Sequence, residues 1–411
     1  MISFRSEPCI RARGMVLAVI LALTVCFTVP CPAIAGLDPA DDTLLPELTA
    51  KPPEPIENGF VPGLKQSYQL ARAWFVTALD PSGLFVYHYN PASGRTSRNN
   101  DALRQLMSTR LLAELASEDP ALVPLHEKNM AAAFSRWYKE DQKGRGFILD
   151  YGYSELGANA MALMATVKSP LFSRYQGNAK ALVESILSLQ NQDGSFEPFF
   201  ILPRDTFDRD YCMAFYAGEA TLALLEYYEK TGDEKALAAA RKAQDHYLDK
   251  YVSHLAENYY PAYVPWQTFA LSHLYAVNHE ARYRDAIFVL NDKLLEIQDK
   301  SRYQGRFFNP DFSRYGGTHS SSDGVFTESL AYALAAAKET GDKEREEHYR
   351  NAIKLAVQNL ENLQYTVEPV RVTSGRIPVT GAIRVREDDG RVRLDSTQHG
   401  MDAMRKVLSV W

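Results

Sequence analysis

The sequence predicts an all-α fold, because the helical spacing of apolar residues covers most of the chain after residue 63. The helices are of two kinds. One kind carries Lys, Arg, Glu and Asp on one face, and the other is apolar nearly all round. The first kind is typical of half-solvated helices and the second of buried ones. Six of each in strict alternation predict an (α/α)6 toroid of six helical hairpins, with an inner and an outer ring.

The twelve helices follow one another as six pairs. The amphipathic member of each pair is predicted for the outer ring, at residues 64–79, 120–138, 178–190, 233–252, 282–298 and 343–363. The member rich in Ala, Gly, Ser, Leu and aromatic residues is predicted for the inner ring, at residues 100–116, 154–167, 210–230, 263–277, 324–340 and 395–410.

The loops between these helices are also of two kinds. After the outer helices comes a repeated phrase of Leu or an aromatic residue, Gln, a Gly turn and a short β-prone run, as in "LSLQNQDGSFEPFF" at 187–200. Glycine there supplies a positive φ. After inner helices come tight Thr-Gly-Asp turns, as in "KTGDEKA" at 230–236. Function is therefore expected at the rim with the long loops, where the inner helices begin.

The N-terminal residues are predicted to form a signal peptide at 1–35 rather than part of the fold. An uncharged apolar run follows Arg5, Arg11 and Arg13 and precedes the small residues of a cleavage site. The run is too short for a standard membrane span, and lipid attachment at Cys26 or Cys31 is the less favoured alternative. We expect export to the periplasm or beyond, an extended Pro-rich lead-in at 36–62, and a toroid domain at 63–411. Either Met1 or Met15 can be the start.

Composition narrows the possible partners. Removal of residues 1–35 leaves 42 basic and 50 acidic residues, a balance that predicts no nucleic-acid partner. Cys212 is then the remaining cysteine, so no intrachain disulfide is expected. Without Cys-x-x-Cys or His-Glu-x-x-His spacing, we expect no metal and no cofactor.

Carboxylates at the inner-helix starts are the candidate catalytic groups. Paired carboxylates supply acid and base for glycosidic cleavage when their environments separate their pKa values. The candidate catalytic residues are Asp208, Asp210, Glu219, Glu328 and His399. The aspartates have an alternative role as helix caps. The charges on apolar helices have an alternative role in a polar network across the toroid centre, in which Arg104 would pair with a glutamate.

Aromatic and forked polar side chains at the same rim are typical of sugar binding, since aromatic faces stack on pyranose rings and arginine fixes hydroxyl or uronate groups. The candidate substrate-binding residues are Arg104, Tyr211, Tyr263, Trp266, Gln267 and Asp395. Arg393, two residues before Asp395, either binds a substrate carboxylate or neutralises Asp395.

The phrases "LQNQDGSF" (189–196) and "YAGEATLALLEYYEKTGD" (216–233) resemble the six-hairpin (α/α)-toroid superfamily, without matching a single family in it. That superfamily includes glycoside hydrolases, polysaccharide lyases, glucuronyl epimerases, terpenoid cyclases and lanthionine cyclases. The Asp-x-Asp-Asp motif of terpenoid cyclases is missing here, and one mature cysteine is too few for the zinc of lanthionine cyclases. The resemblance therefore implies the carbohydrate-active branch.

We expect an exported carbohydrate-active enzyme that acts on a glycan or cell-envelope polysaccharide by hydrolysis, elimination or epimerisation. The alternative is a non-catalytic glycan- or peptide-binding toroid that assists export or assembly of an envelope polymer. A third possibility is a toroid for a lipid or peptide substrate. No integral membrane span is expected after signal cleavage.

Overall fold

The computed structural model describes residues 59–97, 100–300, 304–308, 319–368 and 377–411. The predicted signal peptide and all but the last four residues of the predicted lead-in lie outside these ranges. Within them, no helix is long and apolar enough to cross a membrane.

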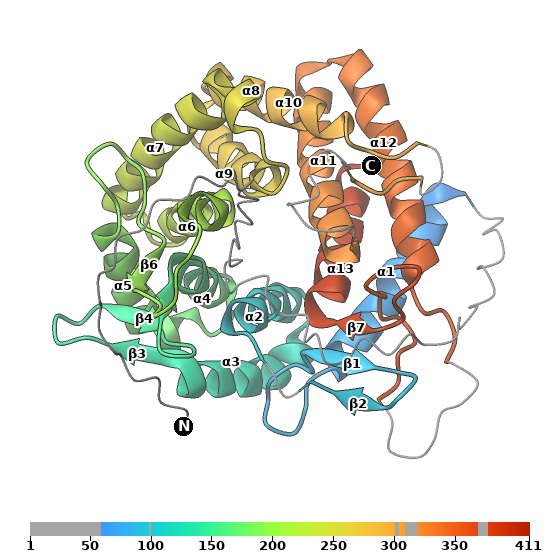
Figure 1. The fold of residues 1–411 in the computed structure, drawn as a ribbon, viewed down its shortest axis with the longest axis horizontal. Coiled ribbons are helices and arrows are strands. Elements are labelled where there is room, and N and C mark those ends of the chain that lie inside the picture. The colour runs from blue at the N-terminus through green and yellow to red at the C-terminus, as the bar shows by residue number, and fades with distance from the viewer. Residues whose placement is uncertain (1–58, 98–99, 301–303, 309–318, 369–376) are drawn as a thin grey trace, which may run out of the picture.

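Twelve long helices of the described chain form two concentric rings (Figure 1). The inner ring consists of α2 (Ala102–Glu118), α4 (Leu156–Lys168), α6 (Arg209–Thr231), α9 (Tyr263–Asn278), α11 (Ser320–Thr340) and α13 (Leu394–Val410). Each inner helix packs on the next, and α13 packs on α2, so the ring is closed. The outer ring consists of α1 (Phe60–Thr77), α3 (Val123–Trp137), α5 (Phe172–Ser188), α7 (Glu234–Leu248), α10 (Ala281–Leu295) and α12 (Lys343–Leu363). The predicted (α/α)6 toroid is confirmed.

The predicted helices differ from the observed ones mainly at their ends. The fourth outer helix stops at Leu248 instead of residue 252 and continues as a π-helical turn, Asp249–Ser253, and a short helix α8 (Leu255–Asn258). A 3-10 turn, Pro120–Leu122, precedes α3, and Asp119 caps it by accepting a hydrogen bond from the Ala121 backbone. The hairpin arrangement is unaffected by these extensions.

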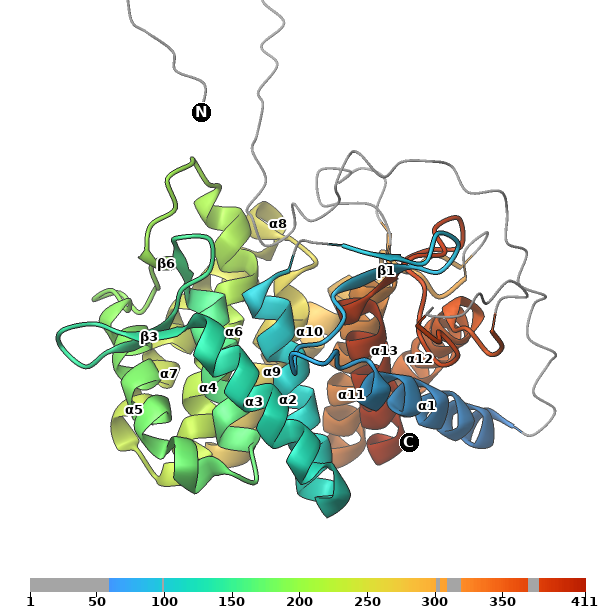
Figure 2. The same ribbon diagram turned by 90° about the horizontal axis from the view of Figure 1, so that it is seen from below.

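Short antiparallel strands lie in the long loops, as the β-prone runs predicted. One sheet has the order β2 (Arg95–Thr96), β1 (His88–Asn90), β7 (Val392–Arg393) and joins the first long loop to the last. The other pairs are β3 (Tyr138–Glu140) with β4 (Gly146–Ile148), and β5 (Ser154–Glu155) with β6 (Phe199–Ile201). Figure 2 shows β1 and β6 toward the upper end of the ring, the end at which the inner helices begin.

The glutamine of the repeated loop phrase clamps neighbouring hairpins together. In three loops its side-chain amide donates to the carbonyl of the turn glycine and to a backbone carbonyl of the next outer helix. Gln190 reaches Ala239 of α7, Gln298 reaches Ala352 of α12, and Gln364 reaches Ser67 of α1, each at 2.9 Å. The phrase is therefore the joint between hairpins, and the last of these joints closes the ring.

The turn glycine of each clamp touches the same outer helix. Gly194 has a φ of 94°, and a methyl group on it would lie 2.2 Å from the carbonyl oxygen of Lys242 in α7. Equivalent methyl groups at Gly305 and Gly381 would lie 1.9 Å from Leu355 O and 2.0 Å from Leu70 O. Glycine is needed at these turns both for the left-handed backbone and for the absence of a side chain.

The opposite end carries the predicted tight turns. Gly232, with a φ of 73°, ends α6 by donating its N–H to Tyr228 O, and Asp233 caps α7 by accepting from the Lys235 backbone at 2.9 Å. Gly341 and Asp342 do the same between α11 and α12.

Replacing Gly194 with alanine should lower the free energy of unfolding by more than about 3 kcal/mol, since the left-handed backbone costs roughly 1–2 kcal/mol and the methyl group also displaces α7. Gly144→Ala is the matched control, because Gly144 has a φ of 74° but open space around it. Urea denaturation measures both. Equal losses at the two positions would show that the contact with α7 contributes nothing.

Candidate functional site

The starts of several inner helices are tied together by hydrogen bonds. Asp150, before α4, accepts from the backbone N–H of Ala102 at the start of α2 (3.0 Å). Arg104 of α2 donates to Asp395 of α13 (2.9 Å), and Arg393 donates to Ser321 of α11 (3.2 Å). The expected gathering of inner-helix starts is thus present for α2, α4, α11 and α13.

Asp395 is held between two arginines. Its two oxygens accept from Arg104 Nε at 2.9 Å and from Arg393 Nε at 2.6 Å, and all three side chains are buried. Burial alone would raise the pKa of Asp395, but the charges of Arg393 and Arg104 outweigh it and hold this pKa well below its usual range. Of the two roles considered for Arg393, neutralising Asp395 is the one observed. Arg104 also donates to Asp101 at 2.7 Å.

The two aspartates before Tyr211 lie at the exposed start of α6. Asp208 is the N-cap, and its side chain accepts from the Tyr211 backbone at 3.0 Å, which is the capping role considered above. Asp210 pairs with Lys250 at 3.0 Å, and its side chain is 86% exposed. Tyr211 itself is half-buried beside Tyr260. A catalytic role for either aspartate stays a prediction.

Three other predicted residues lie between helices. Glu219 is buried where α4 meets α6, so close that a methyl group on Gly157 would lie 2.5 Å from its Oε2. Tyr263 stacks on Tyr251 with ring centroids 4.0 Å apart, and Gln267 accepts from Gln244 of α7 at 3.0 Å. The structure therefore places Tyr263 against the turn that follows α7, and Gln267 against α7 itself.

A network of charges crosses the centre of the toroid; we call it the central charge cluster and define it by Arg110, Glu114, Lys168, Glu226 and Arg405. Arg110 of α2 pairs with Glu226 of α6 at 2.9 Å, although α4 lies between these helices in the ring. Lys168 of α4 also reaches Glu226, at 3.3 Å, and Arg405 of α13 pairs with Glu114 of α2. The polar network considered from the sequence exists: Arg110 pairs with a glutamate, and Arg104 pairs with Asp101 and Asp395.

Two further carboxyl groups adjoin this cluster, Glu328 of α11 and Asp402 of α13. Burial and the negative charge of Asp402 raise the pKa of Glu328 to about 8. Burial also raises the pKa of Asp402, to about 6, against the attraction of Arg405. Asp402 accepts a hydrogen bond from Gln398 at 2.7 Å and has Arg405 at 3.5 Å. Burial thus favours the protonated form of both carboxyl groups, and the negative charge of Asp402 favours it further at Glu328.

His399 precedes Asp402 by one turn of α13. Burial lowers the pKa of His399 to about 4, so the imidazole is neutral at pH 7. Its ring centroid lies 6.4 Å from that of Trp266, and its Nδ1 has no hydrogen-bond partner in the described part of the chain. Asp395, His399 and Asp402 follow the i, i+4, i+7 spacing of one helix face.

Asp402 is the residue that sequence reasoning missed. The signal was present, since Asp402 is a charge in the apolar phrase "HGMDAM", the same costly feature that singled out Glu219 and Glu328. Its helical spacing from Asp395 and His399 was a second signal.

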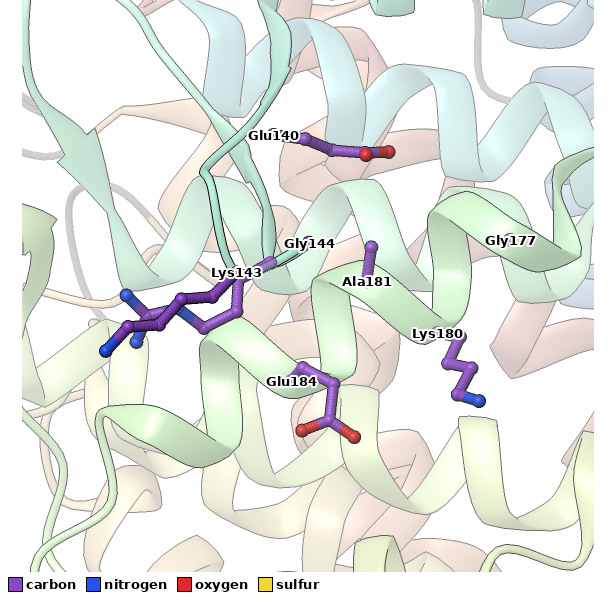
Figure 3. A pocket seen from close by; sticks show the side chains of 8 residues that line it. Glu140, Lys143, Gly144, Gly177, Lys180, Ala181 and Glu184 are labelled. Carbon is purple, nitrogen blue, oxygen red and sulfur yellow. The ribbon is translucent and has the colours of Figure 1, made fainter.

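A separate surface cavity lies outside the ring, between the β3–β4 hairpin and α5 (Figure 3). Its charged lining residues are Glu140, Lys143, Arg145, Lys180 and Glu184. None of the predicted site residues lines it, so it is not the candidate site.

No family model matches the chain, and no curated protein matches its sequence. Solved structures do share its fold. The α-1,6-mannanase GH76A of Salegentibacter sp. HEL1_6 is 13% identical, with 85% of this chain and 100% of that chain covered and a TM-score of 0.60. A D-mannose isomerase is 14% identical, with 85% and 98% covered and a TM-score of 0.61. An unsaturated glucuronyl hydrolase specific for heparin is 10% identical, with 84% and 97% covered and a TM-score of 0.59.

These likenesses establish the fold. The chain shares the (α/α)6 toroid fold with these structures, as its repeated phrases indicated.

Replacing Asp395 with asparagine should destabilise the protein by about 3–5 kcal/mol, because it leaves two buried guanidinium groups without their shared carboxylate. Asp210→Asn removes an exposed ion pair and should cost less than about 1 kcal/mol. Chemical unfolding at pH 7 measures both. A loss at Asp395 no larger than that at Asp210 contradicts the assignment.

Glu328→Gln should change the pH dependence of stability. Since folding raises the pKa of this acid, the native state binds its proton more tightly than the unfolded state, and stability falls as pH rises from about 4.5 to about 8. Glutamine does not titrate, so the free energy of unfolding of the variant, relative to that of the wild type, should increase by on the order of 1 kcal/mol from pH 5.5 to pH 8.5. Melting curves at the two pH values test this, with the exposed Glu184→Gln as control. A gain independent of pH would be inconsistent with a raised pKa.

Proposed function

We propose that this protein is an exported carbohydrate-active enzyme that hydrolyses a glycan. The observation that carries the proposal is the pair Glu328 and Asp402, two carboxyl groups on adjacent inner helices, of which Asp402 has Arg405 at 3.5 Å and Glu328 has a raised pKa. Pairs of titratable groups whose environments push their pKa values apart are the mark of acid–base sites. The fold supports the sugar class, since the three similar structures are a mannanase, a mannose isomerase and a glucuronyl hydrolase.

The two carboxyl groups have complementary roles in this proposal. Glu328, protonated, donates its proton to the glycosidic oxygen, so that the leaving sugar departs as an alcohol. Asp402, ionised, accepts a proton from the water whose oxygen bonds to the anomeric carbon. One water is consumed, and the carboxyl protons return to their starting positions by exchange with solvent.

Neighbouring side chains keep the pair in these states. Arg405 lies 3.5 Å from Asp402 and favours its ionised form, while Gln398 fixes one carboxylate oxygen. We propose that Trp266 and Tyr211 contact sugar rings at the end of the toroid where the inner helices begin. Arg104 holds the helix starts at that end in place through its ion pair with Asp395. Export rests on the predicted signal peptide at 1–35.

Glu328→Gln and Asp402→Asn should each reduce glycan turnover about 10²- to 10⁴-fold, the usual contribution of a general acid or base. Glu184→Gln, at the surface outside the ring, is the control and should retain turnover, and Asp210→Asn tests the catalytic role predicted for Asp210. The measurement is release of reducing ends from a panel of neutral and uronate polysaccharides, α-1,6-mannan and heparin among them. Full turnover by the Glu328→Gln variant, or a loss of turnover in the Asp210→Asn variant alone, would show that the catalytic residues lie outside the ring centre.

A further inference from the structure

Tyr151 has a backbone conformation that its residue type disfavours. Tyr151 and Gly152 are the two residues of a tight turn between Asp150 and Tyr153, whose backbones exchange two hydrogen bonds of 3.0 Å. Both turn residues have positive φ, 46° and 89°. This geometry favours Asn-Gly, and a bulky residue at the first position is strained.

Packing within the protein does not offset this strain. The Tyr151 side chain is 69% exposed, one of the most exposed large hydrophobic side chains among the described residues. His279 is the other non-glycine residue with positive φ among the described residues, and it has an evident structural reason, because it ends α9 by donating its N–H to Tyr275 O. Tyr151 ends no helix. A strained residue whose ring is mostly exposed points to function.

The Tyr151 ring is held in place at the start of the inner helices. Its hydroxyl donates to the carbonyl of Asn100 at 3.1 Å, two residues before α2. The turn itself is anchored by Asp150, which accepts from Trp137 Nε1 at 3.1 Å and from the Ala102 backbone. The phenol ring is therefore exposed, oriented by its hydroxyl, and next to the link between α2 and α4.

We propose that Tyr151 is a stacking platform for a pyranose ring of a glycan chain, at a position outside the Glu328–Asp402 pair. An exposed aromatic face is suited to the apolar face of a sugar ring. Glu328 lies eight residues into α11, about 12 Å along the helix from its start. A ligand that reaches both places contains several sugar units. This inference rests on the proposed function and adds that the substrate is an oligosaccharide or polymer, not a single sugar.

Tyr151→Asn separates the effect of the residue on stability from its effect on glycan binding. Asparagine suits the turn, so the variant should melt at a higher temperature than the wild type, yet it should bind long glycans about fivefold to tenfold more weakly. Tyr151→Phe keeps the ring and loses the hydroxyl contact with Asn100, so it should weaken binding less than Tyr151→Asn does. His279→Asn is the matched control, because it relieves the same backbone strain at α9 and should leave glycan binding unchanged.

The probe is an array of neutral and uronate oligosaccharides of two to eight units. Each glycan that the wild type retains is then titrated to measure its affinity, and its turnover is measured. We expect Tyr151→Asn to raise KM for the longest chains, with kcat and the KM of disaccharides unchanged. If the Tyr151→Asn variant binds long chains as tightly as the wild type, the platform is overturned. Glu328-dependent turnover, and with it the proposed function, is unaffected by that result. A lower melting temperature for Tyr151→Asn overturns the strain argument. A wild type that retains no glycan overturns the platform as well.

Discussion

The close approach of each turn glycine to the next outer helix is the contact on which the ring depends. At Gly194, Gly305 and Gly381 the loop backbone lies so near a helix carbonyl that no side chain fits. The glutamine of each clamp donates to a carbonyl of the same helix, so each of these loops both ends a hairpin and fixes the next one. Because the last clamp joins the loop after α12 to α1, the repeat closes on itself.

Ring closure is what brings distant residues into one site. Arg104 and Asp395 are 291 positions apart in the chain, yet they form a buried ion pair because α13 returns to α2. The α11–α13 contact is equally close, since a methyl group on Gly324 would lie 2.7 Å from the backbone of His399. That contact places Glu328 and Asp402 within electrostatic reach of each other.

The inside of the ring carries buried charged side chains from several helices. Buried ions are stable only when paired, and Arg110, Glu226 and Lys168 satisfy one another across three helices. Glu328 differs, because burial and a like charge favour its neutral form. At Glu328 these two effects outweigh the attraction of Arg110 and Arg405.

The sequence by itself determined the hairpins, their order and the end of the ring at which the long loops lie. Those features follow from local patterns: helical periodicity, glycine at turns with positive φ, and aspartate at helix starts. The sequence also singled out Arg104, Asp395, His399 and Glu328, since charges on apolar helices are visible without coordinates.

Only the tertiary structure decided which of these side chains meet. The orientation of an inner helix about its own axis depends on packing against both neighbours, so it turned Tyr263 and Gln267 toward the outer ring and Asp402 toward Glu328. The pKa values of those carboxyl groups likewise depend on burial and on charges from other hairpins, which no local pattern contains.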